Sequence, residues 1–477
     1  MFFVRVTVPI VLFAVFSDAF RLNRGLKRGK RETGDAEPDY KWFTQILDHF
    51  DPSNVEAKWN QRYLVNDEHY RRKNGGPVFL EISGELEMTE LTGAGLNYAE
   101  KFGAMCFKLE HRYYGKSRPT SNLSVQNLRY LSSHQALADI ANFIWHMTSL
   151  NSFPAGTKWI VFGGSYAGSL AAWSRLKYPH LIHAAVASSP IMEPKPEFPD
   201  YFETVHDVIA NYDVLCADSI YEANSLFEQM INITGGAKIL SKMFRLCSDL
   251  DPRDKNQIAN AANELSFVFP EIVQSSKATD GGTMESLDIV CEIMTDSAIG
   301  LPLQRYSNVD YILNSEVDCR NVAYRTMITL QRNEENFDFQ RQWLWQCCTE
   351  LGLFLTTPDS GSMFGSLIDV QYYLNTCSDA FNSKFTKSRV TRATEINRIE
   401  FGGKTFKGTR VVIVTGSIDP WKNNGIIDTD DPSVVKITID GTSHCADMEP
   451  WDEDDSIPLT EAREKIEDIL TEWISIE

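Results

Sequence analysis

The sequence has few basic residues for its size and no cysteine pair with the spacing of a zinc site. Lys and Arg number 46 against 65 Asp and Glu, which gives a net charge of −19. Such an acidic chain lacks the basic face that nucleic-acid binding requires, so we expect no nucleic-acid partner. Nine cysteines are present, but none forms a C-x-x-C pair. We therefore expect no metal site and no cofactor.

Long apolar runs are absent beyond the N-terminus. Residues 2–16 are apolar apart from Arg5 and are followed by the small or polar run SDA, a pattern that predicts a signal peptide over residues 1–19. The basic stretch 20–31 ends in RGKR and predicts a pro-segment that is cut off, with a solvated linker as the alternative. No later run is long enough to span a bilayer, so the mature chain should carry no membrane span.

The cysteines are concentrated in the middle of the chain. Seven of the nine fall between Cys216 and Cys377. Behind a signal peptide most of them should be oxidised, and the odd count leaves at least one thiol free or paired with another chain. The sequons at Asn122 and Asn232 predict glycosylation in a secreted chain.

One stretch, residues 158–190, carries the most specific pattern. An apolar run at 159–162 predicts a buried strand and is followed by two glycines, Ser165, and a helical spacing of apolar residues. Strand, tight glycine turn with a serine, and helix form the nucleophile elbow of an α/β-hydrolase. The last glycine of the G-x-S-x-G pattern is Ala167 here, which is small enough to fit. Taken alone, the pattern could also be a glycine turn with an incidental serine.

The rest of the chain supplies the strands and helices that this fold needs. A strand at 77–82, a strand at 105–109, a helix at 134–150 and the elbow alternate as in a doubly wound parallel sheet. We predict that an early strand within 40–50 pairs with a strand at 59–65. Near the C-terminus, strands at 409–415 and 434–439 precede a closing amphipathic helix at 459–474. The predicted fold class is α/β, an α/β-hydrolase.

The sheet pattern is interrupted after the elbow. Residues 193–400 have few strand-like runs, many helical ones and most of the cysteines, so we predict a mainly helical, disulfide-bonded cap domain. The hydrolase domain then consists of a first part over 40–192 and a second part over 401–477.

The catalytic residues follow from the order of the strands. In α/β-hydrolases the nucleophile, acid and histidine occur in that order on loops after strands. Asp419 follows the predicted strand at 409–415, and His444 follows the strand at 434–439. We predict a triad of Ser165, Asp419 and His444. His111 is the main rival base, but it precedes the elbow, so we assign it a structural role beside the site.

The oxyanion hole needs two N–H donors beside the nucleophile. We expect the backbone N–H groups of Tyr166, directly after Ser165, and of Gly84, in the loop after the 77–82 strand. Glu85 should lie near the substrate, where it pairs either a substrate amine or an internal arginine such as Arg112.

Several long motifs resemble one family. The stretches WFTQILDHF, EHRYYGKSRP, FGGSYAGSLAAWSRLKYPHLIHAAVASSP, WLWQCCTELG, SIDPW and GTSHCADM are similar to those of the serine peptidases that include lysosomal Pro-Xaa carboxypeptidase, dipeptidyl peptidase II and thymus-specific serine protease. The resemblance runs from about residue 40 to the C-terminus. It implies a helical cap over an α/β-hydrolase, the triad named above, and cleavage of short peptides, often next to proline.

The resemblance also implies a disulfide pattern and shows two departures. Matching positions imply Cys216–Cys291, Cys247–Cys319 and Cys348–Cys377, with Cys106, Cys347 and Cys445 left over. A further family cysteine is replaced by Thr357, so one family disulfide is expected to be missing. The family's G-G-E-G oxyanion pattern reads SGEL at 83–86.

The functional prediction is a secreted or lysosomal serine exopeptidase that acts on short peptides through an acyl-enzyme. An esterase or lipase on the same fold and a non-catalytic binding protein are the alternatives. Trp421 and Trp345 are predicted to bind substrate by walling a proline pocket, with Trp343 and Trp451 as further candidates; a core role is the alternative for all four.

Location, pH dependence and assembly depend on the family. The resemblance implies an endosomal or lysosomal lumen or secretion, and on that basis we expect an acidic pH optimum. That optimum requires burial to lower the pKa of His444 by more than Asp419 raises it. Carboxypeptidase and dipeptidyl peptidase action both stay open, as does the oligomeric state, for which a homodimer is the assembly considered.

Overall fold

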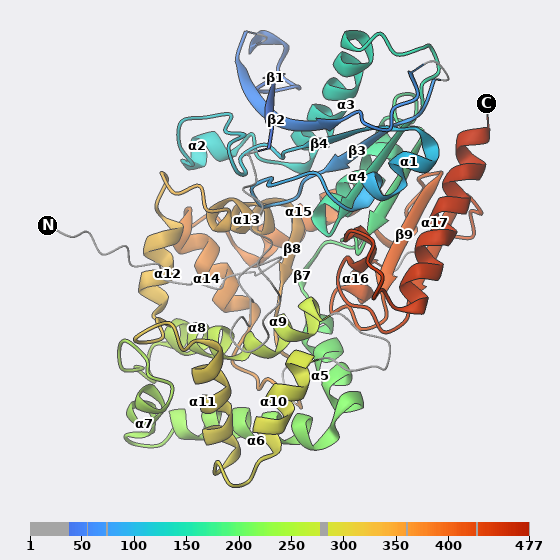
Figure 1. Ribbon diagram of the computed structural model, residues 1–477. Coiled ribbons are helices and arrows are strands. Elements are labelled where there is room, and N and C mark those ends of the chain that lie inside the picture. Colours follow the sequence, from blue (N-terminus) through green and yellow to red (C-terminus); the bar gives the residue numbers. More distant parts are fainter. Residues whose placement is uncertain are drawn as a thin grey trace, which may run out of the picture.

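The computed structural model describes residues 38–476 except 55, 73–74, 277–284, 359–360 and 426–427, and Figure 1 shows its arrangement. The predicted signal peptide and the basic stretch 20–31 lie outside the described residues. Within the described ranges, no helix is both long and apolar enough to cross a bilayer.

An eight-stranded sheet forms the frame of the molecule, in the order β1-β2-β4-β3-β5-β6-β9-β10. Strand β2 runs antiparallel to β1 and to β4, and all other neighbours are parallel. The central strands are almost fully buried, because a parallel sheet covered on both faces selects continuous apolar runs. The strands are β1 Lys41–Ile46, β2 Lys58–Asn66, β3 Val78–Ile82, β4 Met105–Leu109, β5 Trp159–Gly164, β6 Ala184–Ser188, β9 Val411–Gly416 and β10 Val434–Ile439.

Helices cover both faces of this sheet, as the predicted α/β-hydrolase fold requires. Alternate strand residues point to opposite faces. On one face Phe79 and Ile160 pack in one cluster with the closing helix α17 (Ile457–Ser475), which runs along the edge of the molecule in Figure 1. On the other face Leu80 and Val161 belong to a larger cluster with α3 (Ser133–Leu150) and α4 (Tyr166–Lys177).

A mainly helical segment, here called the cap, lies between β6 and β9 in the chain. It occupies the lower left of Figure 1, beside the sheet, and its apolar residues share the larger core cluster with α3 and α4. Its helices are α5 Asp200–Tyr212, α6 Val214–Ile231, α7 Gly236–Met243, α8 Lys255–Ser266, α9 Val268–Ser275, α10 Glu285–Thr295, α11 Pro302–Leu313, α12 Tyr324–Gln331, α13 Gln340–Gln346, α14 Val370–Ala380 and α15 Lys387–Phe401.

Two features of this region have no counterpart in the sequence prediction. A short parallel pair joins β7 (Lys195–Glu197) to β8 (Gly352–Phe354). A π-helical turn, Cys347–Leu351, follows α13 directly. Outside the cap, short α-helices occur at α1 Ala99–Phe102, α2 Val125–Leu128 and α16 Lys422–Gly425.

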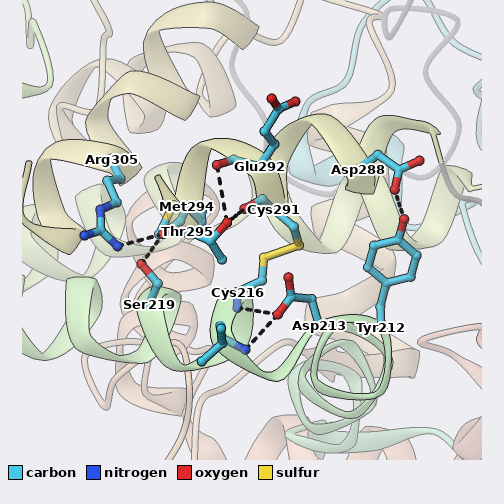
Figure 2. Close-up of a disulfide and its surroundings, with 11 residues drawn as sticks. Tyr212, Asp213, Cys216, Ser219, Asp288, Cys291, Glu292, Met294, Thr295 and Arg305 are labelled. Atoms are coloured by element: carbon cyan, nitrogen blue, oxygen red, sulfur yellow. Dashed lines mark hydrogen bonds between the residues drawn. A yellow bond between two sulfur atoms is a disulfide. The ribbon is translucent and has the colours of Figure 1, made fainter. Parts of the chain in front are cut away.

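Three disulfides cross-link the cap: Cys216–Cys291, Cys247–Cys319 and Cys348–Cys377. They are the pairs that the family resemblance implies, and Cys106, Cys347 and Cys445 are free and buried. Figure 2 shows the bridge between α6 and α10. Beside it the carbonyl of Met294 accepts hydrogen bonds from Ser219 Oγ at 2.6 Å and Arg305 Nη1 at 3.1 Å. The bridge and these bonds together hold α10 and the start of α11 against α6.

Removing the bridge between α6 and α10 should destabilise the cap. Cys216→Ala with Cys291→Ala should cost about 2–4 kcal/mol, because the cross-link spans a sequence separation of 75 residues and restricts the unfolded chain. Thermal unfolding of the oxidised proteins measures this, and the double variant should melt several degrees below the parent. In dithiothreitol the two should differ much less. Equal melting temperatures under oxidising conditions would contradict the prediction.

Candidate active site

Ser165 lies on the sharp turn between β5 and α4. Its backbone has φ 57° and ψ −128°, a conformation that non-glycine residues rarely adopt. The Ser165 N–H donates to the Ser188 carbonyl on β6 at 2.9 Å, and its own carbonyl accepts from the Ser169 N–H at 3.1 Å. These bonds hold a strained residue between the sheet and the first turn of the helix, and such strain is typical of functional sites.

Two glycines permit the close approach of strand and helix. A Cβ on Gly163 would lie 2.2 Å from the Ala167 carbonyl oxygen, and a Cβ on Gly168 would lie 2.7 Å from the Ser188 carbonyl oxygen. Ala167 itself is buried. Its Cβ would be 3.8 Å from a Cβ placed on Gly84, an ordinary contact distance. The turn therefore accommodates alanine where the motif usually has glycine.

Asp419 and His444 occupy the loops after β9 and β10. His444 Nδ1 lies 3.0 Å from each carboxylate oxygen of Asp419, and both side chains are buried. The Trp421 backbone N–H donates to Asp419 Oδ1 at 2.9 Å and fixes the carboxylate. With Nδ1 engaged by the acid, Nε2 is the ring nitrogen that can exchange a proton with a hydroxyl.

The loops that carry Ser165 and His444 are in contact. Gly164, directly before Ser165, lies against Cys445, directly after His444: a Cβ on Gly164 would be 3.0 Å from Cys445 Sγ. The Cys445 N–H also donates to Ser189 Oγ, beyond the end of β6, at 3.0 Å. The structure thus brings the three residues predicted as a triad to the same end of the sheet.

The electrostatics of His444 favour its protonated form. Burial lowers the pKa of the imidazole, but the Asp419 carboxylate and the hydrogen bond to it, with a contribution from Cys445, outweigh burial. The pKa of His444 therefore lies well above its usual 6.5. The sequence-based expectation of an acidic optimum required burial to prevail, and the structure gives the opposite direction.

The two expected oxyanion donors lie on adjoining segments beside Ser165. Tyr166 is the first residue of α4, where N–H groups have no partner within the helix. Gly84 follows β3 and lies against the first turn of the same helix through Ala167. The N–H of the preceding Ser83 donates to the Leu109 carbonyl at 3.0 Å and anchors the loop to β4.

Glu110, in the EHRYYG motif, fixes the far side of this loop. Its carboxylate accepts the Met88 N–H at 2.9 Å and the Ser117 hydroxyl at 2.7 Å, and it pairs with Arg62. Gly115 is required here, because a Cβ would lie 2.1 Å from Glu110 Oε1. The motif therefore has a structural role in positioning the segment that carries Gly84 and Glu85.

Arg112 is not the partner of Glu85. Its guanidinium donates to both oxygens of Asp139, each at 2.6 Å, and also to the Tyr130 carbonyl. Glu85 is buried, and burial raises the pKa of its carboxyl to about 7, offset in part by its own backbone N–H and by His444. The structure therefore does not pair Glu85 with Arg112, and contact with a substrate amine stays a prediction.

The Tyr166 side chain connects the elbow to the cap. Its hydroxyl accepts from Gln346 Nε2, in α13, at 2.8 Å, and lies 3.3 Å from His111 Nε2 and 3.2 Å from Ser133 Oγ. Burial lowers the pKa of His111 to about 4, so this ring is neutral near physiological pH. His111 is thus in the supporting position expected for it, and Gln346 is a residue that the sequence analysis did not identify.

A second cap residue, Gln274 in α9, contacts the loops of the acid and the histidine. Its carbonyl accepts the His444 N–H at 3.4 Å, and its side-chain oxygen accepts from Trp421 Nε1 at 2.9 Å. The carbonyl of the preceding Val273 accepts from Ser443 Oγ at 2.7 Å. Nothing in the sequence pattern indicated Gln274, because its role depends on where the cap folds back.

The predicted pocket tryptophans have different surroundings. The Trp421 ring stacks on Phe198 and lies 6.4 Å from the His444 ring, centroid to centroid. Trp345 packs against Phe381 and Phe385 within the cap. Of the two further candidates, Trp343 lies 5.8 Å from the Tyr166 ring, whereas Trp451 is 49% exposed and contacts Tyr98. Trp421 and Trp343 are therefore the tryptophans with ring contacts to site residues.

The remaining predicted features lie at the surface or concern metals. The Asn122 side chain is half-buried and bonded to the Asn127 side chain at 2.7 Å, whereas Asn232 is exposed at the end of α6. Across the described part of the chain, no group of three or more His, Cys, Asp or Glu side chains could hold a metal ion.

Comparisons with known proteins agree on one family. The sequence model of the serine carboxypeptidase S28 family matches residues 45–466. K12H4.7 of Caenorhabditis elegans, whose name describes it as a serine protease, is 36% identical over 450 residues, 91% of this chain and 87% of the relative. Mouse thymus-specific serine protease is 32% identical, covering 92% and 88%. Mouse lysosomal Pro-X carboxypeptidase is 28% identical, covering 85% and 83%.

Among solved structures, the proline iminopeptidase of Mycobacterium smegmatis aligns with 91% of this chain and 98% of its own. The identity is 11% and the TM-score 0.35, which is too low for this likeness to support an argument.

The contact between the two catalytic loops can be tested with a pair of substitutions. Gly164→Ala should lower kcat/KM on a short peptide about tenfold, because its methyl group meets Cys445 Sγ at 3.0 Å and displaces the neighbouring His444. Adding Cys445→Ala removes the sulfur, leaves contacts of 3.6 Å and should restore most of the loss. A double variant no better than Gly164→Ala alone would show that this contact does not limit the site.

Proposed function

The chain belongs to the serine carboxypeptidase S28 family and is a serine-type peptidase, and on that premise we propose that it hydrolyses short peptides through an acyl-enzyme on Ser165. The observation that carries the proposal is the bond from His444 Nδ1 to both oxygens of Asp419, 3.0 Å each, in a loop packed against the Ser165 turn. With Nδ1 bonded to the acid, the proposal assigns the serine proton to His444 Nε2.

The proposed reaction has two halves. His444 Nε2 takes the Ser165 proton while Oγ attacks the scissile carbonyl carbon, and the imidazolium that forms is stabilised by Asp419. The same proton then passes to the leaving amine, the C–N bond breaks, and an ester on Ser165 is left. Water attacks this ester with His444 again as base, which releases the acid and restores the serine.

Backbone donors would stabilise the charge that develops on the carbonyl oxygen. We assign this role to the N–H groups of Tyr166 and Gly84, whose segments adjoin at Ala167. The Tyr166 side chain is held by Gln346 of the cap at 2.8 Å, so the first turn of α4 is fixed before substrate binds. Such preorganisation is what makes an oxyanion hole effective.

The proposed substrates are short peptides cut near one end, next to proline. The support for short substrates is that the cap contacts both the elbow, through Gln346, and the histidine loop, through Gln274. Trp421, buried beside His444, would form one wall of a pocket for the proline ring. The proline preference is supported by the name of the lysosomal Pro-X carboxypeptidase relative.

We propose that the protein works in an oxidising lumen or outside the cell. The support is the apolar segment 2–16, the sequons at Asn122 and Asn232, and the three cap disulfides. Removal of residues 1–19 and 20–31, glycosylation and a lysosomal or secreted destination belong to this proposal.

The nucleophile can be tested by one substitution with a matched control. Ser165→Ala should keep the melting temperature and lower hydrolysis of a proline-containing peptide by about 10³-fold or more, because no other group can form the ester. Ser174→Ala, on the same helix, removes a buried hydroxyl that donates to the Ala171 carbonyl within that helix and should keep most activity. Near-normal turnover by folded Ser165→Ala would refute the role.

The pH dependence follows from the raised pKa of His444. Only the neutral imidazole can accept the serine proton, and a raised pKa means that this form is lost at a higher pH during acidification. We therefore expect kcat/KM to fall below an apparent pKa above 6.5 and to be highest at neutral or mildly alkaline pH. A pH–rate profile measures this, and full activity retained at about pH 5 would contradict it.

A further inference from the structure

The loop after β3 carries two buried polar groups without a hydrogen-bond partner in the described part of the chain. They are Ser83 Oγ and Glu85 Oε1, on either side of the proposed oxyanion donor Gly84. The Glu85 side chain is only 4% exposed. A buried polar atom without a partner costs free energy, and beside a catalytic triad a polar group of the substrate is one partner that can satisfy it.

The groups around Glu85 come from several elements, and none is a lysine or an arginine. Its carboxyl interacts electrostatically with Tyr114 in the loop after β4 and with Tyr166 at the start of α4. It also interacts with Cys347 in the π-helical turn of the cap and with His444 in the loop after β10. Within the described residues Glu85 takes part in no ion pair, and Arg112 and Arg62 are bound by Asp139 and Glu110.

Three other carboxylates, two buried and one half-buried, show what a structural role looks like in this molecule. Asp139 receives two bonds from Arg112. Glu110 receives Arg62 and backbone N–H groups. Glu350 accepts the Ser133 N–H at 3.1 and 3.0 Å and Gln346 Nε2 at 3.2 Å. Glu85 differs from all three, because it lies beside the triad and keeps one oxygen available.

The charge of Glu85 decides which ligand it can take. Burial raises the pKa of its carboxyl to about 7, so the carboxyl is more than half ionised at the mildly alkaline pH that favours neutral His444. An anion in a buried site is stabilised most by a cation that hydrogen bonds to it. A substrate's α-ammonium group supplies both the positive charge and the hydrogen-bond donors, whereas a substrate carboxylate would be repelled.

We propose that Glu85 binds the free α-ammonium group of the substrate, so that the enzyme removes residues from the N-terminus of short peptides. This proposal rests on the proposed function, because it concerns the same site. Of the two directions of cleavage that the family resemblance leaves open, it selects removal from the N-terminus. Ser83 Oγ, on the same loop, would add a hydrogen bond to the bound peptide. Glu85 is thereby a specificity-determining residue.

The test measures binding rather than turnover. In a Ser165→Ala background, titration calorimetry at about pH 7.5 compares three probes: alanyl-prolinamide, N-acetyl-alanyl-prolinamide and N-acetyl-alanyl-proline. The first should bind about tenfold or more tightly than the second, the range expected for a hydrogen bond to a charged group. Because this background lacks the serine, the result does not depend on Ser165 being the nucleophile.

Substitutions at Glu85 separate recognition from a structural role. Adding Glu85→Gln should abolish the preference for the free amine while leaving binding of the acetylated amide nearly unchanged, and Glu85→Asp should keep part of the preference. Glu87→Gln, two residues along the loop and half-exposed, is the matched control and should change neither affinity.

Four outcomes would overturn the proposal. They are equal binding of the free and acetylated amides, tightest binding of N-acetyl-alanyl-proline, equal weakening of both amides by Glu85→Gln, and binding of none of the probes. Tightest binding of the acetylated acid would indicate recognition of a C-terminal carboxylate instead. Failure of Ser165→Ala to reduce turnover would contradict the proposed function while leaving this binding comparison intact.

Discussion

The left-handed backbone of Ser165 is the constraint on which the rest of the site depends. A non-glycine residue adopts φ 57° only when its surroundings enforce it. The Ser165 N–H bonds to the Ser188 carbonyl. Because Gly163 and Gly168 have no side chains, α4 can lie close to β5 and β6. That approach places the start of α4 at the end of the sheet where the loops of Asp419 and His444 also lie.

The cap takes part in this geometry. Gln346 holds the Tyr166 hydroxyl, and Gln274 contacts both the histidine loop and Trp421. The chain that forms these contacts is cross-linked by three disulfides. A disturbance of the cap should therefore reach the first turn of α4 and the histidine loop through two separate hydrogen-bonded routes.

Local patterns in the sequence predicted the frame and the order of the candidate residues. Apolar runs such as WIVF and VVIV identify buried strands, and the order Ser165, Asp419, His444 follows from where those strands end. Long-range contacts could not be predicted in this way. The β7–β8 pair and the positions of Gln274 and Gln346 depend on how the cap folds back. The choice of Asp139 as the partner of Arg112 depends on how α3 packs beside the loop after β4. The direction of the His444 pKa shift depends on a balance between burial and the Asp419 carboxylate, and that balance is set by the folded structure.

The central claim is that Ser165 becomes acylated with His444 as its base. Incubation with a fluorophosphonate, followed by intact-mass measurement and peptide mapping, tests this directly. We expect one adduct per chain, located on the peptide that contains Ser165 and formed far more slowly in His444→Ala. An adduct on another residue, or no adduct on the folded protein, would contradict it.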